Sequence, residues 1–143
     1  MRVVVEAPAG RTIREHAASA YPQECCGALV GRASGESRVV AAAWPVENAS
    51  EVDRTHRYAI APSSYLEVER RANAQGLTLL GFYHSHPDAP ARPSERDLLQ
   101  ALPRVDYIIV SVVRATPSDI TCWRLRDDRV AFAPEEIEWR PES

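Results

Sequence analysis

The chain alternates short apolar runs with polar segments rich in turn residues. Runs of about four to eight residues dominated by β-branched and aromatic side chains are typical of β-strands. Residues 34–36, Ser-Gly-Glu, form a turn that would join two of these runs as a hairpin. We therefore expect strands at residues 3–5, 24–31, 38–44, 57–60, 77–83, 107–113 and 120–125, with residues 130–132 as a short edge strand.

Two further segments have the spacing of amphipathic helices. Thr12 and Ser64 each precede a glutamate by three residues, a capping-box pattern that marks the start of a helix. Pro22 would stop the first helix, and Gly76 would end the second. These signals predict helices at residues 12–21 and 64–75.

Helices that alternate with strands predict an α/β domain built around a mixed β-sheet flanked by helices. The 143 residues have the length of one domain, so we expect residues 1–143 to fold as a single unit. The acidic segment at residues 134–143 is expected to be a partly ordered tail.

Two of the four histidines, His84 and His86, lie one residue apart at the end of an apolar run. Side chains two residues apart on a strand share a face, so both imidazoles would point the same way. Ser94 has the character of an N-cap for a short helix at residues 95–100, with Asp97 in its first turn. Two imidazoles and a carboxylate can serve as three ligands of a catalytic zinc ion, with water as the fourth. A polar strand end followed by a plain capping box explains the same residues.

Four of these positions resemble the motif of the JAMM (MPN-plus) zinc metalloprotease family: two histidines one residue apart, a serine after seven more residues and an aspartate after another two. The resemblance implies an MPN/JAMM fold with a cytidine-deaminase-like architecture. It implies that His84, His86 and Asp97 bind one zinc ion whose fourth ligand is water. It also implies that Ser94 stabilises the tetrahedral intermediate of the reaction.

Glu24 is the only acid in the apolar segment at residues 24–31. From the residues alone, a solvent-exposed position at the strand mouth is the simpler interpretation. The family, however, places its catalytic glutamate at the start of an early strand, and this resemblance implies that Glu24 moves a proton from water to the leaving amine. The neighbouring Cys25 and Cys26 lack a zinc-ligand spacing and are expected to be small buried side chains, with Cys26 on the face of Glu24.

The family holds a peptide substrate along extended backbone, which makes His56 and Arg57 candidates for a substrate groove. A position on a loop surface is the more ordinary alternative for both residues.

Composition argues against several functional classes. The 17 basic and 20 acidic residues give a net charge of −3 without a basic run, so neither nucleic acid nor an anionic membrane is an expected partner. No apolar stretch has the length of a signal peptide core or a membrane span, which favours a cytoplasmic protein. The three cysteines form no disulfide framework, in agreement with a reducing compartment.

The resemblance implies a zinc metallopeptidase that hydrolyses a peptide or isopeptide bond. The chain is similar to the small bacterial members of the family, which implies a ubiquitin-like sulfur-carrier protein as substrate, cut after its Gly-Gly tail. Such a tail has no side chains and can lie extended in a narrow groove. The alternative is a non-catalytic MPN-type protein-binding module. A zinc deaminase would need His-x-Glu and Pro-Cys-x-x-Cys motifs, and the chain has neither.

Overall fold

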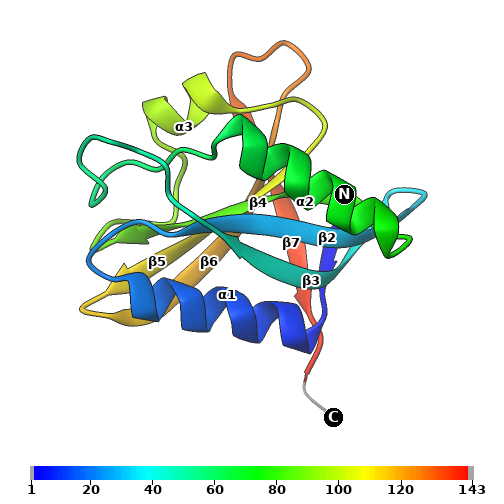
Figure 1. The fold of residues 1–143 in the computed structure, drawn as a ribbon, viewed down its shortest axis with the longest axis horizontal. Helices are drawn as coiled ribbons and strands as arrows, with labels where there is room; N and C mark the ends of the chain where they lie inside the picture. The colour runs from blue at the N-terminus through cyan, green and yellow to red at the C-terminus, as the bar shows by residue number, and fades with distance from the viewer. Residues whose placement is uncertain (1, 142–143) are drawn as a thin grey trace.

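The computed structural model describes residues 2–141. Within this range the chain forms three helices and seven strands (Figure 1). In chain order they are β1 (Arg2–Val5), α1 (Ala7–Ala20), β2 (Cys26–Ser34), β3 (Ser37–Val46), α2 (Pro62–Ala74), β4 (Thr78–Pro87), α3 (Glu95–Gln100), β5 (Asp106–Val113), β6 (Thr116–Leu125) and β7 (Phe132–Trp139).

The strands form one mixed sheet that closes into a barrel in the order β1, β3, β2, β4, β5, β6, β7. β4 runs parallel to β5, and β1 runs parallel to both β3 and β7, whereas the other neighbouring strands are antiparallel. The expected mixed sheet is therefore confirmed, but its closure was not foreseen. Residues 134–139, which were expected to belong to a partly ordered tail, form most of β7, which pairs with β6 on one side and β1 on the other. Residues 142–143 lie outside the described range.

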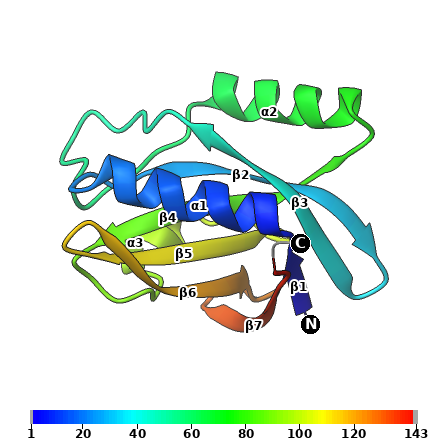
Figure 2. The same cartoon turned by 90° about the horizontal axis from the view of Figure 1, so that it is seen from below.

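The two long helices cover opposite faces of the sheet (Figures 1 and 2). Ile13 and Ala17 of α1 are fully buried in the main hydrophobic core, against side chains from most of the strands. Val68 and Ala72 of α2 pack in a smaller cluster on the other face. None of the helices in residues 2–141 is both long and apolar enough to cross a membrane.

Both long helices begin earlier than the capping-box pattern predicts. α1 starts at Ala7 instead of Thr12, and α2 starts at Pro62 instead of Ser64. Each has a proline in its first turn and no side-chain cap. A proline is well suited to that position, because its missing N–H would have no partner within the helix and its φ angle is already helical. The predicted end of the second helix is confirmed, since α2 stops just before Gly76, which has a φ of +71°.

The strand expected at residues 57–60 does not form. Asn48 holds this segment instead. Its Nδ2 donates to the carbonyls of Glu24 and Arg57, both at 3.0 Å, and its Oδ1 accepts from the backbone N–H of Ala59 at 3.2 Å. A side-chain amide thus supplies the hydrogen bonds that a neighbouring strand would provide, and it ties the segment to the residues just before β2.

Candidate metal centre

His84 and His86 lie near the carboxyl end of β4, on the same face of the strand, with ring centroids 5.0 Å apart. Phe82 shares this face and packs against Tyr65 of α2, so the imidazoles lie on the side of the sheet that carries α2 and α3. Both imidazoles are buried, with 1% and 8% of their surface exposed. The alternation of the strand therefore delivers two metal-binding groups to one sheltered position.

The serine and aspartate of the motif form the start of α3. The Ser94 Oγ accepts the backbone N–H of Asp97 at 3.0 Å, and Asp97 Oδ2 accepts the backbone N–H of Ser94 at 2.9 Å. The expected short helix with a Ser94 N-cap is confirmed, including its bounds. These reciprocal bonds point the Asp97 carboxylate back toward β4.

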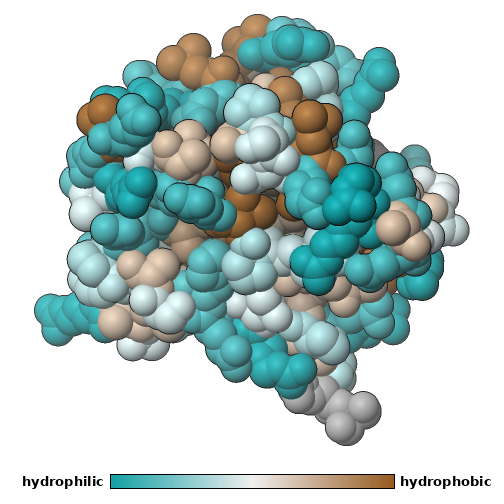
Figure 3. Space-filling model, in the orientation of Figure 1, coloured by the Kyte–Doolittle hydropathy of each residue, from teal (hydrophilic) through white to brown (hydrophobic). Residues whose placement is uncertain are grey.

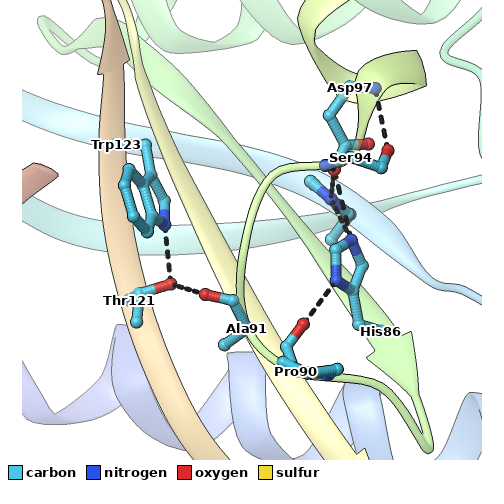
Figure 4. Close-up of polar contacts among 8 residues, drawn as sticks. His86, Pro90, Ala91, Ser94, Asp97, Thr121 and Trp123 are labelled. Atoms are coloured by element: carbon cyan, nitrogen blue, oxygen red, sulfur yellow. Dashed lines mark hydrogen bonds and ion pairs between the residues drawn. The ribbon is translucent and has the colours of Figure 1, made fainter. Parts of the chain in front are cut away.

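Three polar atoms from the two elements converge on one point (Figure 4). His84 Nε2, His86 Nε2 and Asp97 Oδ2 lie 3.2 Å from one another in each of the three pairs. Ligand atoms of a tetrahedral zinc ion, at bond lengths near 2.0–2.1 Å, are about 3.3 Å apart. The donor set and its spacing therefore fit a single zinc ion with one position left open.

The far side of each imidazole is held differently. His86 Nδ1 donates to the carbonyl of Pro90 at 2.8 Å. His84 Nδ1 is buried and has no hydrogen-bond partner among the described residues, but its ring stacks on Tyr58 with the centroids 4.4 Å apart. Sequence reasoning missed Tyr58 as a site residue, and neither a ring contact nor a backbone carbonyl has a sequence signature.

Glu24 approaches the histidines from the segment before β2. One of its carboxylate oxygens lies within 4.8 Å of a ring nitrogen of both His84 and His86, and the residue is 7% exposed. Its backbone N–H donates to the carbonyl of Arg54 at 2.7 Å, and the next residue is held by Ser85, whose Oγ accepts the Cys25 N–H at 2.8 Å. These contacts thus hold the Glu24 carboxylate beside the two imidazoles.

The electrostatics of the four groups differ. Burial raises the pKa of Glu24 to about 8. Burial would also raise the pKa of Asp97, but hydrogen bonds from His84 and His86 outweigh it and hold that pKa well below its usual value. Burial lowers the pKa of His84, whereas the bonds of His86 to Asp97 and to the Pro90 carbonyl outweigh burial and raise its pKa. One carboxylate is therefore suited to remain charged and the other to exchange a proton near neutral pH.

Two cavities flank this centre. One, of about 280 Å³, is lined by Glu24, His86 and Ser94 together with residues of the neighbouring loops, His56 among them. The other, of about 220 Å³, is mainly aromatic and shares Tyr58 with the centre. In the view of Figure 3, hydrophobic residues lie in a hollow near the middle of the visible surface.

The other residues that the sequence singled out have different surroundings. His56 is at the cavity mouth and pairs with Asp53 at 2.9 Å, whereas Arg57 is tied through its carbonyl to Asn48. Cys25 and Cys26 are both buried free thiols, as expected. Burial raises the pKa of the Cys26 thiol to about 12, so it stays protonated.

The family model for prokaryotic homologs of the JAB domain matches residues 6–126, a range that contains all the residues of the centre. A desampylase from Haloferax volcanii is 36% identical over 99 residues, which span 68% of this chain and 69% of that protein. A probable TtuB-protein conjugate cleaving protease from Thermus thermophilus is 38% identical over 96 residues, which span 67% of this chain and 61% of that protein.

Solved structures share the fold. A protein from Desulfitobacterium hafniense has a TM-score of 0.85 and 29% identity, over 98% of this chain and 94% of its own. A JAB1/MPN domain protein from Archaeoglobus fulgidus has a TM-score of 0.55 and 21% identity, over 97% of each chain. The arrangement of strands and helices is thus one that occurs in JAB1/MPN domains.

Proposed function

The chain belongs to the family of prokaryotic homologs of the JAB domain, and on that premise we propose that it is a zinc-dependent metallopeptidase of the JAMM type. One observation carries the proposal: the ligand atoms of His84, His86 and Asp97 meet at 3.2 Å, with Glu24 beside them. A binding module would have no need for a buried carboxylate whose pKa is shifted toward neutrality.

The proposed substrate is a ubiquitin-like sulfur-carrier protein, cut at the peptide or isopeptide bond that follows its Gly-Gly tail. The relative from Thermus thermophilus is named for the cleavage of protein conjugates, which supports a protein-linked tail as the substrate. The space beside the centre also suits such a tail, because a chain segment without side chains needs only a narrow passage.

His84, His86 and Asp97 would hold the zinc ion. A bound zinc ion polarises a carbonyl oxygen and lowers the pKa of a coordinated water to about 7. Asp97 brings the negative charge of this set, and the Ser94 backbone N–H that it accepts also lowers its pKa and so favours the charged form. The burial of the set excludes bulk water, which strengthens each electrostatic contact.

Ser94 and Glu24 would carry out the remaining steps. The Ser94 Oγ accepts a bond from the Asp97 N–H, so its own hydrogen remains available to donate to the oxygen that becomes negative in the transition state. Glu24 would take a proton from the attacking water and return it to the leaving amine. Because Glu24 lines the 280 Å³ cavity, the leaving group would lie there.

The test is intact-mass spectrometry of a ubiquitin-like sulfur carrier that has extra residues after Gly-Gly. The zinc-loaded protein should remove those residues. Glu24→Gln keeps the size of the side chain but cannot move the proton, so it should retain zinc and lose turnover by a factor of at least about 100. Glu69→Gln, at an exposed position on α2, is the matched control and should cleave normally.

No cleavage by a wild-type sample that contains zinc would overturn the peptidase proposal and favour a non-catalytic MPN-type binding module. Full activity of Glu24→Gln would remove Glu24 from the proton transfer.

A further inference from the structure

The loop between β4 and α3, residues 88–93, is fixed by an unusual run of hydrogen bonds. Three consecutive carbonyls in it each accept a bond from a side chain, and each donor comes from a different strand. Figure 4 shows two of these bonds, those to Pro90 and Ala91. The bonds run from Ser111 Oγ to Ala89 at 2.6 Å, from His86 Nδ1 to Pro90 at 2.8 Å and from Thr121 Oγ1 to Ala91 at 2.6 Å.

The outer two donors lie on strands that belong to the rigid barrel. Ser111 on β5 is 5% exposed and is the register partner of His86 on β4. Thr121 lies on β6, and its Oγ1 accepts the indole N–H of Trp123 at 2.8 Å. Since the indole nitrogen can only donate, the single hydroxyl hydrogen of Thr121 is left to point at the Ala91 carbonyl. The contact with Trp123, on the same strand, therefore fixes the direction of the hydrogen bond from Thr121 to Ala91.

The middle carbonyl acts on the metal centre. A carbonyl can only accept, so the bond from His86 to Pro90 requires the hydrogen of the imidazole to be on Nδ1. In the neutral imidazole Nε2 then keeps its lone pair, as a metal ligand must, and it is this atom that meets His84 and Asp97. His84 has no equivalent hydrogen bond at its far nitrogen among the described residues, so Pro90 provides the one backbone anchor of this kind.

We propose that Ser111 and Thr121 are positioning residues of the metal site. By holding the carbonyls on either side of Pro90, they fix the Pro90 carbonyl against His86 and so set the tautomer and direction of that ligand. The same loop leads into Ser94 and the Asp97 carboxylate, so its position affects two of the three ligands. This inference rests on the metal centre of the proposed function and is independent of the substrate.

The experiment measures zinc affinity by competition with a chromogenic chelator, on metal-free wild type, Ser111→Ala, Thr121→Val and the double variant. Each single variant should bind zinc about tenfold more weakly and the double variant up to about 100-fold, the range found for partners of metal ligands. The visible absorption spectrum of the cobalt-substituted double variant should also change, because the orientation of His86 changes. Thr121→Ser keeps the hydroxyl and should restore affinity.

Two controls separate positioning from stability. Thr116→Val makes the same replacement at an exposed position of β6 and should leave zinc affinity unchanged. The melting temperature of each metal-free variant reports the loss of a hydrogen bond from the fold. Thr121 is only partly buried, so Thr121→Val carries the test if Ser111→Ala does not fold.

A lower melting temperature with wild-type zinc affinity and an unchanged cobalt spectrum would overturn the inference, because the hydroxyls would then serve the fold alone. Failure of the wild-type protein to bind zinc would instead overturn the metal centre on which the inference rests.

Discussion

As a proposed zinc ligand, Asp97 would have two roles that depend on different properties of its side chain. As part of the capping box it needs only an oxygen that accepts the Ser94 N–H, whereas as a ligand it needs its charge. Asp97→Asn separates the two, because the amide keeps an acceptor and removes the charge. We expect zinc content of the purified variant to fall at least about tenfold, while the metal-free stability changes by about 1 kcal/mol or less.

Metal analysis of the purified proteins tests this prediction. Asp119→Asn, at an exposed position on β6, is the control and should retain the zinc content of the wild type. Unchanged zinc in Asp97→Asn would take this carboxylate out of the metal site.

At the scale of single residues, the direction of a side chain could be predicted from the sequence wherever the local backbone geometry determines it. His84 and His86 share a face because strands alternate, and Asp97 points back to β4 because a capping box fixes it. The contacts of Tyr58 and of the Pro90 carbonyl depend on loops folding against distant strands. No spacing in the chain marks such contacts.

Elements defined by strong apolar runs were predicted well, and those defined by their neighbours were not. β4 and β5 have long buried runs that identify them as strands. β7 has half-buried and exposed residues and includes a proline, and it becomes a strand because β6 and β1 are available on both sides. The starts of α1 and α2 were misplaced because a proline in the first turn competed with a later capping-box pattern.

Two buried ion pairs that share Arg38 link three strands that are not adjacent in the sheet. Arg38 on β3 makes two bonds to Asp106 at the start of β5, one of them at 2.9 Å, and donates to Glu135 on β7 at 3.0 Å. Arg38 is 5% exposed and Asp106 is fully buried. Among the described residues, Arg38→Met would leave the more distant Arg124, at 3.5 Å, as the remaining partner of the buried Asp106 charge. We expect a loss of about 3–5 kcal/mol in the free energy of unfolding, measured by urea denaturation.

The double variant Arg38→Met with Asp106→Leu should regain part of this stability, because it removes the unpaired charge as well as its partner. A loss below about 1 kcal/mol in the single variant would show that Arg124 alone compensates the Asp106 charge.

At the scale of the whole molecule, the fold and the site are held by different parts of the chain. The main core lies around α1, where side chains from most strands pack on Ile13 and Ala17. The candidate metal centre lies on the other face of β4, the face that carries α2 and α3. Closure of the barrel through β7 completes the sheet without involving the proposed metal ligands. The protein should therefore fold without metal, unlike small domains whose folding free energy comes from zinc binding.

Removal of zinc tests this separation. A ligand that binds only the folded state at about 100 times its dissociation constant adds about 2.7 kcal/mol. For a chain of this length the melting temperature should then fall by on the order of 5–10 °C when a chelator removes the metal. The far-UV circular dichroism at 25 °C should stay unchanged, because the strands and helices keep their own core. The melting temperature of Asp97→Asn should change neither when zinc is added nor when the chelator removes it, because its site no longer holds the ion. Unfolding of the wild type by the chelator at 25 °C would show instead that the metal ligands are part of what holds β4 and α3 in the fold.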